Sequence, residues 1–138
     1  MGGFLDKNFH AFVHRGDTST FRENTIEAFK DSENLGFNYL ETDLRETKDN
    51  KIVTLHDEDL ERVCGKKIKI NEINFEELNK LNFYKLGHTP TLYELLEEFP
   101  SSFFNLDLKI PKIGKTVLKI LRETNAEERV CIGSFNSK

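Results

Sequence analysis

The sequence lacks both long apolar runs and an excess of basic charge. No stretch approaches the roughly 18 consecutive apolar residues that a membrane-spanning helix needs, so we expect no stable membrane anchor. The first residues contain no basic segment followed by an apolar one, which is the pattern of a secretory signal. The net charge of −4 leaves no basic stripe for nucleic acid. These absences favour a cytoplasmic domain that acts on small molecules.

Cysteine is also scarce. Cys64 and Cys131 lie far apart and form no CxxC motif, so the sequence supports no disulfide and we expect reduced thiols. With 138 residues, of which 37% are hydrophobic, the chain can form one core. We therefore treat residues 1–138 as one domain or as part of a larger one.

Short apolar runs alternate with segments of helical character along the chain. Alternation of this kind predicts βαβ units and a parallel sheet. About five strands are too few for a complete eight-stranded barrel, and an open doubly wound sheet is disfavoured because no Gly-rich phosphate loop follows the first strand. The predicted strands are residues 9–13, 37–44, 52–55, 103–108 and 129–133, and residues 57–73 are expected to form a loop.

Helices are indicated by capping signals and by apolar spacing. Three segments begin with a capping pair, in which a polar residue is followed three positions later by Glu. These pairs are Asn24 with Glu27, Asn74 with Glu77, and Thr91 with Glu94. After the last pair, Leu92, Leu95, Leu96 and Phe99 have the spacing of a helix that faces a core. A further stripe consists of Ile113, Val117, Ile120 and Leu121.

Charged side chains gather on one face of two predicted strands. Residues two apart in a strand point to the same side, so Glu41 shares a face with Asp43, and Asp107 with Lys109. The leucines between them point the other way. Taken singly, each acid is more often a surface charge. Together, the three carboxylates form an all-oxygen ligand set of the kind that Mg²⁺ or Ca²⁺ prefers.

Two histidines and an arginine complete the candidate site. His14 and His56 titrate near neutrality, so one can accept a proton while the other donates one. Arg15 offers a planar fork of donors to a phosphate, and Lys109 adds a point charge. Asp57 either orients His56 or caps the following turn, and we favour the turn.

The order and spacing of these residues resemble those of glycerophosphodiester phosphodiesterases. The similarity extends from about residue 10 to residue 135, and its combination of motifs is highly specific although each motif alone is weak. The motifs are His14-Arg15-Gly16, Glu23-Asn24-Thr25, Leu40-Glu41-Thr42-Asp43-Leu44, Thr47-Lys48-Asp49, His56-Asp57, Pro90-Thr91-Leu92-Tyr93-Glu94 and Asn105-Leu106-Asp107-Leu108-Lys109, and Leu60, Arg62 and Gly65 continue the likeness after His56-Asp57.

The resemblance implies a TIM-barrel enzyme that uses a divalent metal to hydrolyse glycerophosphodiesters to an alcohol and glycerol 3-phosphate. It implies that Glu41, Asp43 and Asp107 hold the metal, and that His14 and His56 are the acid–base pair. By the same resemblance, Arg15 and Lys109 bind the phosphate of the substrate.

Two residues depart from the family pattern. Arg22 stands where Pro is usual, and Asp107 stands where Glu is usual, shortening that ligand by one methylene. Family members also continue beyond a fifth strand. We therefore expect a partial TIM-type barrel with about five parallel strands, intervening helices and no last strands.

Alternatives remain open on the sequence alone. The chain could be a catalytically incomplete fragment or a binding module that retains the metal and phosphate site, or a phospholipase similar to sphingomyelinase D. An open barrel exposes strand edges with unpaired backbone groups, so we also expect a homodimer formed through those edges.

Overall fold

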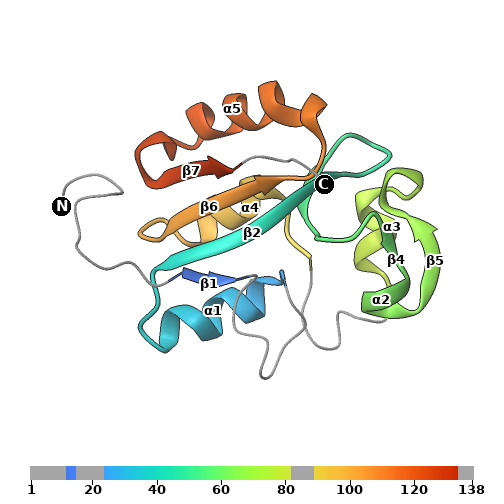
Figure 1. The fold of residues 1–138 in the computed structure, drawn as a ribbon, viewed down its shortest axis with the longest axis horizontal. Helices are drawn as coiled ribbons and strands as arrows, with labels where there is room; N and C mark the ends of the chain where they lie inside the picture. Colours follow the sequence, from blue (N-terminus) through green and yellow to red (C-terminus); the bar gives the residue numbers. More distant parts are fainter. Residues whose placement is uncertain (1–11, 15–23, 82–88, 134–138) are drawn as a thin grey trace.

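The computed structural model describes residues 12–14, 24–81 and 89–133, which form a curved sheet with helices along one face (Figure 1). The described sheet has five strands, in the order β1-β2-β6-β7, with β3 attached to β2. In Figure 1, α1 and α5 flank this sheet and α4 lies behind β2 and β6. None of the helices in these residues is long and apolar enough to cross a membrane.

The strands and helices have the following bounds. The main sheet contains β1 (Phe12–His14), β2 (Tyr39–Glu46), β3 (Ile52–Thr54), β6 (Phe103–Leu108) and β7 (Val130–Gly133). A separate two-stranded sheet contains β4 (Asp59–Leu60) and β5 (Lys66–Lys69). The α-helices are α1 (Ile26–Asn34), α2 (Glu61–Cys64), α3 (Phe75–Asn79), α4 (Leu92–Glu98) and α5 (Gly114–Glu123), and the 3₁₀ turns are Ile70–Glu72, Pro111–Ile113 and Glu127–Arg129.

Parallel pairing of β2 with its neighbours confirms the βαβ expectation. β1 and β6 both run parallel to β2, and β7 runs parallel to β6. The β2–β6 ladder is continuous from Tyr39 opposite Phe103 to Leu44 opposite Leu108. Residues of equal depth therefore lie side by side on the two strands, which sets the geometry of the site.

The expectation of a further parallel strand at 52–55 is wrong. β3 pairs antiparallel with the end of β2, with Leu44 opposite Thr54 and Glu46 opposite Ile52. The Lys48–Lys51 turn is too short for the crossover that a parallel connection requires, so the chain forms a hairpin. β1 pairs only with the start of β2, at residues 39–41, which leaves the far end of that strand edge to β3.

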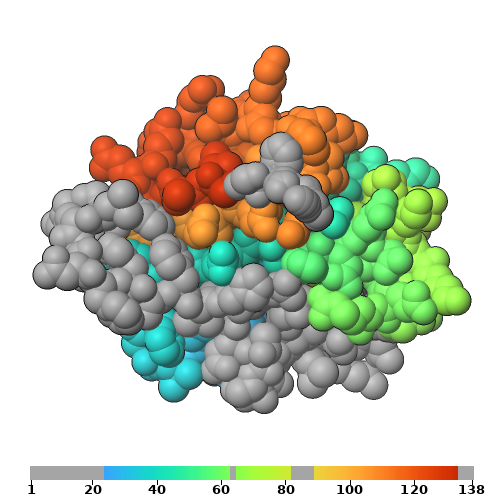
Figure 2. All heavy atoms as spheres, viewed as in Figure 1, coloured from blue at the N-terminus to red at the C-terminus, as the bar shows by residue number. Residues whose placement is uncertain are grey.

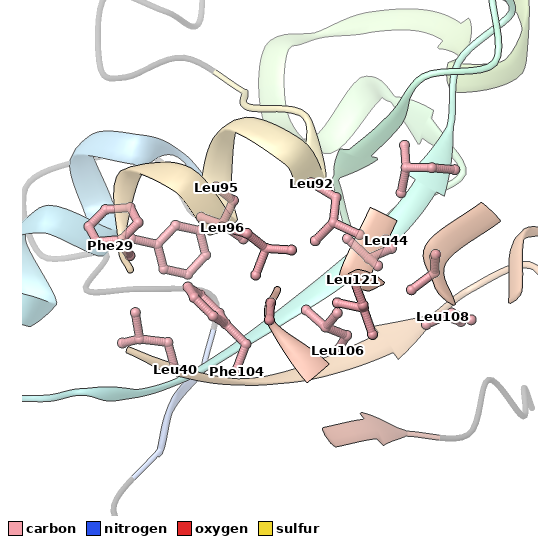
Figure 3. Packing of buried hydrophobic residues seen from close by; sticks show 14 of the residues in the cluster. Phe29, Leu40, Leu44, Leu92, Leu95, Leu96, Phe104, Leu106, Leu108 and Leu121 are labelled. Atoms are coloured by element: carbon pink, nitrogen blue, oxygen red, sulfur yellow. The ribbon is translucent and has the colours of Figure 1, made fainter. Parts of the chain in front are cut away.

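The main core lies between the sheet and the helices (Figure 3). Leu40 and Leu44 of β2 and Leu106 of β6 are fully buried there against α4 and α5, as the alternating pattern predicts. Phe29, Phe99 and Phe104 meet edge to face, with ring centroids 6.2–6.5 Å apart, a favourable arrangement for aromatic rings.

Residues 57–73 do not form the expected loop. They contain β4, α2, β5 and a 3₁₀ turn, and together with α3 they form a lobe at one end of the molecule (Figures 1 and 2). The few apolar residues of this polar segment pack with neighbouring residues into a second, smaller apolar cluster. Its buried members are Val53, Leu55, Leu60, Ile70, Ile73 and Leu78.

The capping predictions succeed at two of three positions. Thr91 and Asn74 both form capping boxes, with Glu94 and Glu77 respectively, and thereby begin α4 and α3. The prediction for α1 is one residue early. Thr25 is the N-cap and accepts the Ala28 N–H at 3.1 Å, while Asn24 lies just outside the helix.

Candidate functional site

Two carboxylates and an ammonium lie together at the carboxyl ends of β2 and β6. Asp43 is directly opposite Asp107 in the parallel ladder. Lys109 Nζ lies 2.9 Å from Asp107 Oδ2 and 3.7 Å from Asp43 Oδ1. Asp43 is only 2% exposed, so the positive charge of Lys109 offsets the cost of burying this acid beside the partly exposed Asp107.

Glu41 occupies the same face one pleat earlier. Its register partner is Asn105, whose side-chain amide donates to Glu41 Oε2 at 3.4 Å. On the other side, His14 of β1 is opposite Glu41 in backbone register. The described structure does not include the side chain of His14, and Arg15, His10 and His88 lie outside the described residues. Their predicted roles stay predictions.

Asn24 is not the helix cap that the sequence analysis expects. Its backbone adopts a positive φ of 59° and its side chain is buried against β2. The side-chain oxygen accepts a hydrogen bond from Thr42 Oγ1 at 2.7 Å, and the amide nitrogen donates to Asp43 Oδ2 at 3.4 Å. Because Thr25 already caps α1, the amide of Asn24 is available to hold Asp43.

Two hydrogen bonds attach the backbone of Leu55 and His56 to β2. The Leu55 N–H donates to the Asp43 carbonyl at 3.0 Å, and Arg45 Nε donates to the His56 carbonyl at 2.9 Å. The backbone from the Leu55 nitrogen to the His56 carbonyl is therefore fixed relative to β2, the strand that carries Glu41 and Asp43.

Arg45 is a site residue that the sequence analysis missed. It follows Glu41 and Asp43 at the same two-residue spacing, and that alternation was the available signal. Burial lowers the pKa of Arg45 from its ordinary value, while the negative charges of Glu58, Asp57, Asp43 and Asp107 oppose that shift. The guanidinium thus lies within the field of the site acids.

The Asp57 side chain contacts the His56 ring, which agrees with the first of the two roles considered from sequence rather than with the favoured turn cap. Asp57 Oδ1 lies 2.7 Å from His56 Nδ1. Arg62 Nε donates to Asp57 Oδ2 at 2.7 Å, and its Nη2 donates to Oδ1 at 3.1 Å. These bonds, that of Arg62 first, lower the pKa of Asp57 to about 2.

The carboxylate oxygens at the carboxyl ends of β2 and β6 are the type of ligand that a hard divalent cation prefers. Asp107 Oδ1 is buried and makes no hydrogen bond within the described part of the chain, so an acceptor oxygen is open beside Asp43. As placed, the described His, Cys, Asp and Glu side chains form no group of three able to hold a metal ion. Lys109 instead provides the positive charge between the two aspartates.

Comparison with known proteins places these residues in a family context. Residues 14–137 match the Glycerophosphoryl diester phosphodiesterase family. A glycerophosphodiester phosphodiesterase of Caldanaerobacter subterraneus subsp. tengcongensis is 36% identical, over 90% of this chain and 57% of that protein. A protein named probable glycerophosphodiester phosphodiesterase 2 of Mycobacterium tuberculosis is 35% identical, over 93% of this chain and 49% of that protein.

A solved structure supports the same relationship. The glycerophosphodiester phosphodiesterase of Thermotoga maritima superposes with a TM-score of 0.82 at 32% identity, covering 94% of this chain and 56% of that one. This similarity confirms the expected partial TIM-type barrel. The chain spans about half the length of the curated relatives it matches.

Proposed function

The chain belongs to the glycerophosphoryl diester phosphodiesterase family, and we propose that it carries the metal-binding and phosphate-binding residues of a phosphodiester hydrolase. The proposed substrates are glycerophosphodiesters, cleaved to an alcohol and glycerol 3-phosphate. The observation that supports this proposal most strongly is the cluster of Asp43, Asp107 and Lys109 in register at the ends of two parallel strands. Ligands of α/β barrels bind at that end.

Glu41, Asp43 and Asp107 are the proposed ligands of a divalent cation, Mg²⁺ or Ca²⁺. When bound, such an ion would withdraw charge from a phosphoryl oxygen and offset the charge that develops in the transition state. Lys109 contacts both aspartates and offsets part of their charge, and a cation bound to them would free its ammonium for a phosphate oxygen. Arg15 is the proposed second phosphate ligand.

His14 and His56 are the proposed proton-transfer pair. One removes a proton from the attacking hydroxyl, and the other protonates the leaving alcohol. Support for His56 comes from its hydrogen bond to Asp57 and from the attachment of its backbone to β2. A cytoplasmic location, a small-molecule phosphodiester as the substrate and the absence of a nucleic-acid partner stay predictions.

Self-association through sheet edges is a further part of the proposal. β1 and β7 end the order of the described sheet, and within the described residues no strand pairs with the outer edge of either. Unpaired edges favour pairing with another chain, so we propose a homodimer. Light scattering over a range of concentrations tests this, and a monomer at every concentration would contradict it.

The test of activity is release of glycerol 3-phosphate from glycerophosphocholine by the purified 138-residue chain. We expect release with Mg²⁺ or Ca²⁺, loss of release with chelator, and a decrease on the order of 10²–10⁴-fold in His56→Ala. Lys119→Ala, on the exposed part of α5, is the matched control.

Two other outcomes separate the alternatives. Metal binding by calorimetry without release would favour a binding module that retains the site but needs residues beyond those of this chain for turnover. Release of choline or a cyclic phosphate from a sphingolipid, but not from glycerophosphocholine, would favour the phospholipase similar to sphingomyelinase D.

A further inference from the structure

Arg62, Asp57 and His56 form a chain of hydrogen bonds that begins on helix α2 and ends on the imidazole ring of His56, a candidate catalytic group. Arg62 of α2 reaches Asp57 with two of its nitrogens, at 2.7 and 3.1 Å. Asp57 in turn meets His56 Nδ1 at 2.7 Å. The Asp57 side chain is 21% exposed, so it is more shielded than His56 or Arg62 on either side of it.

The fork of Arg62 determines how Asp57 can act. A guanidinium that donates to both carboxylate oxygens holds the carboxylate plane in one orientation, which a single contact cannot do. The Arg62 contact, followed by that of His56, lowers the pKa of Asp57 from 3.8 to about 2, so this carboxyl is ionised at any pH at which a histidine titrates. An ionised carboxylate can only accept hydrogen bonds.

It follows that His56 Nδ1 must carry the hydrogen in the contact with Asp57. In a neutral ring the other nitrogen, Nε2, is then the proton acceptor. The backbone of His56 is held by a separate contact, because Arg45 donates a hydrogen bond to the His56 carbonyl. Two arginines from different elements thus restrain His56, one through its ring and one through its main chain.

We propose that Arg62 and Asp57 are positioning residues that hold His56 in the Nδ1–H tautomer and leave Nε2 to exchange the proton in catalysis. The assignment of His56 to proton transfer rests on the proposed function, whereas the tautomer does not. Neither Arg62 nor Asp57 needs to touch substrate. Arg62 lies in the lobe formed by residues 57–73 and α3, which gives that lobe a role in the site.

The first arm of the test is nitrogen NMR of the neutral ring in the 138-residue chain. His56→Gln identifies the signals that belong to this residue. We expect a protonated Nδ1 and an unprotonated Nε2 in the wild type. A protonated Nε2 would overturn the proposal, whether or not the chain has activity.

The second arm compares variants of the arginine. Arg62→Met should shift the ring toward the Nε2–H tautomer, and Arg62→Lys should restore the wild-type signals in part, since it keeps the charge without the fork. Arg122→Met, on the exposed surface of α5, is the matched control and should change nothing. An unchanged tautomer in Arg62→Met would overturn the role of Arg62.

The third arm uses turnover, where the chain has it. Outer partners that orient a histidine typically affect activity by about 10–100-fold, so we expect kcat to fall by that factor in Arg62→Met with KM little changed. A tautomer shift without any turnover in the wild type would support the positioning pair and count against the proposed hydrolase. An unchanged kcat in an active chain would overturn the proposal.

Discussion

The two faces of the β2–β6 ladder are made of the same strands but held by different forces. One face presents Leu40, Leu44 and Leu106 to the helices, where they are fully buried in the main core (Figure 3). The other presents Asp43, Asp107 and Lys109 to one another. Burial of apolar surface is non-directional, so the first face needs only residues of suitable size.

The charged face depends on individual atoms. Each of its carboxylates has a defined partner at a defined distance, because a charge removed from water must regain its lost interactions. Asn24 links the two kinds of face, since it bonds both to Thr42 and to Asp43. The comparison therefore predicts a hierarchy: stability resides mainly in the leucine face, and specificity in the charged one.

The largest effect should come from truncation in the leucine face. Leu106→Ala removes a fully buried side chain from the middle of β6 and leaves a cavity, which should cost about 2–5 kcal/mol of the free energy of unfolding. Leu118→Ala, which is 43% exposed on α5, is the control and should cost less than about 0.5 kcal/mol. Urea unfolding measures both, and equal losses would contradict the assignment of the core.

Loss of the Asn24 side chain, which links the two faces, should cause the second largest loss in the free energy of unfolding. Asn24→Gly removes the amide but suits the positive φ at this position, so it isolates the side chain. Loss of partners for the buried Thr42 and Asp43 should cost about 1–3 kcal/mol. Asn125→Gly, at another positive φ in the turn after α5, is the matched control. A loss as small as that of the control would show that the Asn24 amide is dispensable.

Removal of the Lys109 ammonium should cause the third largest loss in the free energy of unfolding. Lys109→Met removes the ammonium that contacts both Asp43 and Asp107, and should lower the free energy of unfolding by about 1–2 kcal/mol. Double-mutant cycles with Asp107→Asn and Asp43→Asn separate the two pairs. The coupling should be larger for Asp107, whose contact is 2.9 Å rather than 3.7 Å. The reverse order would contradict the described placement of Lys109.

The smallest effect should be the pH dependence of the Asp57–Arg62 pair. The pKa of Asp57 is about 2 in the folded chain, below its ordinary value of 3.8, so the unfolded chain binds this proton first as the pH falls. The pair should therefore stabilise the fold above about pH 4, and this contribution should be lost progressively toward pH 2. Because Arg62 is half exposed, we expect at most about 1 kcal/mol.

Comparing urea unfolding of the wild type and Arg62→Met at pH 5, 3.5 and 2.5 tests this prediction. The difference between them should shrink with falling pH. A difference that stays constant, or grows in acid, would contradict it.

Much of the architecture could be predicted because it depends on patterns within one segment. The alternation of Leu and charged residues in β2 and β6 identified both faces, and the spacing of Leu92, Leu95 and Leu96 identified the buried side of α4. The capping boxes of Thr91 and Asn74 were visible for the same reason. Such patterns act over a few residues, where backbone geometry alone relates side chains.

Two of the errors occurred where contacts between distant segments override local preference. Nothing within residues 57–73 shows that they fold into a lobe, because the apolar cluster that stabilises them also draws on Val53, Leu55 and Leu78. Asn24 has the local character of a cap, but its amide is held by β2.

The sequence by itself therefore determined which residue types share a face of each strand, and from this it predicted that carboxylates, histidine and lysine form one site. The tertiary structure decided which atoms pair: Lys109 with both aspartates, Arg45 with the carbonyl of His56, and Arg62 with Asp57. The reason is physical. Periodicity relates residues within a strand or helix, whereas hydrogen bonds and ion pairs between elements depend on distances that exist only once those elements have packed.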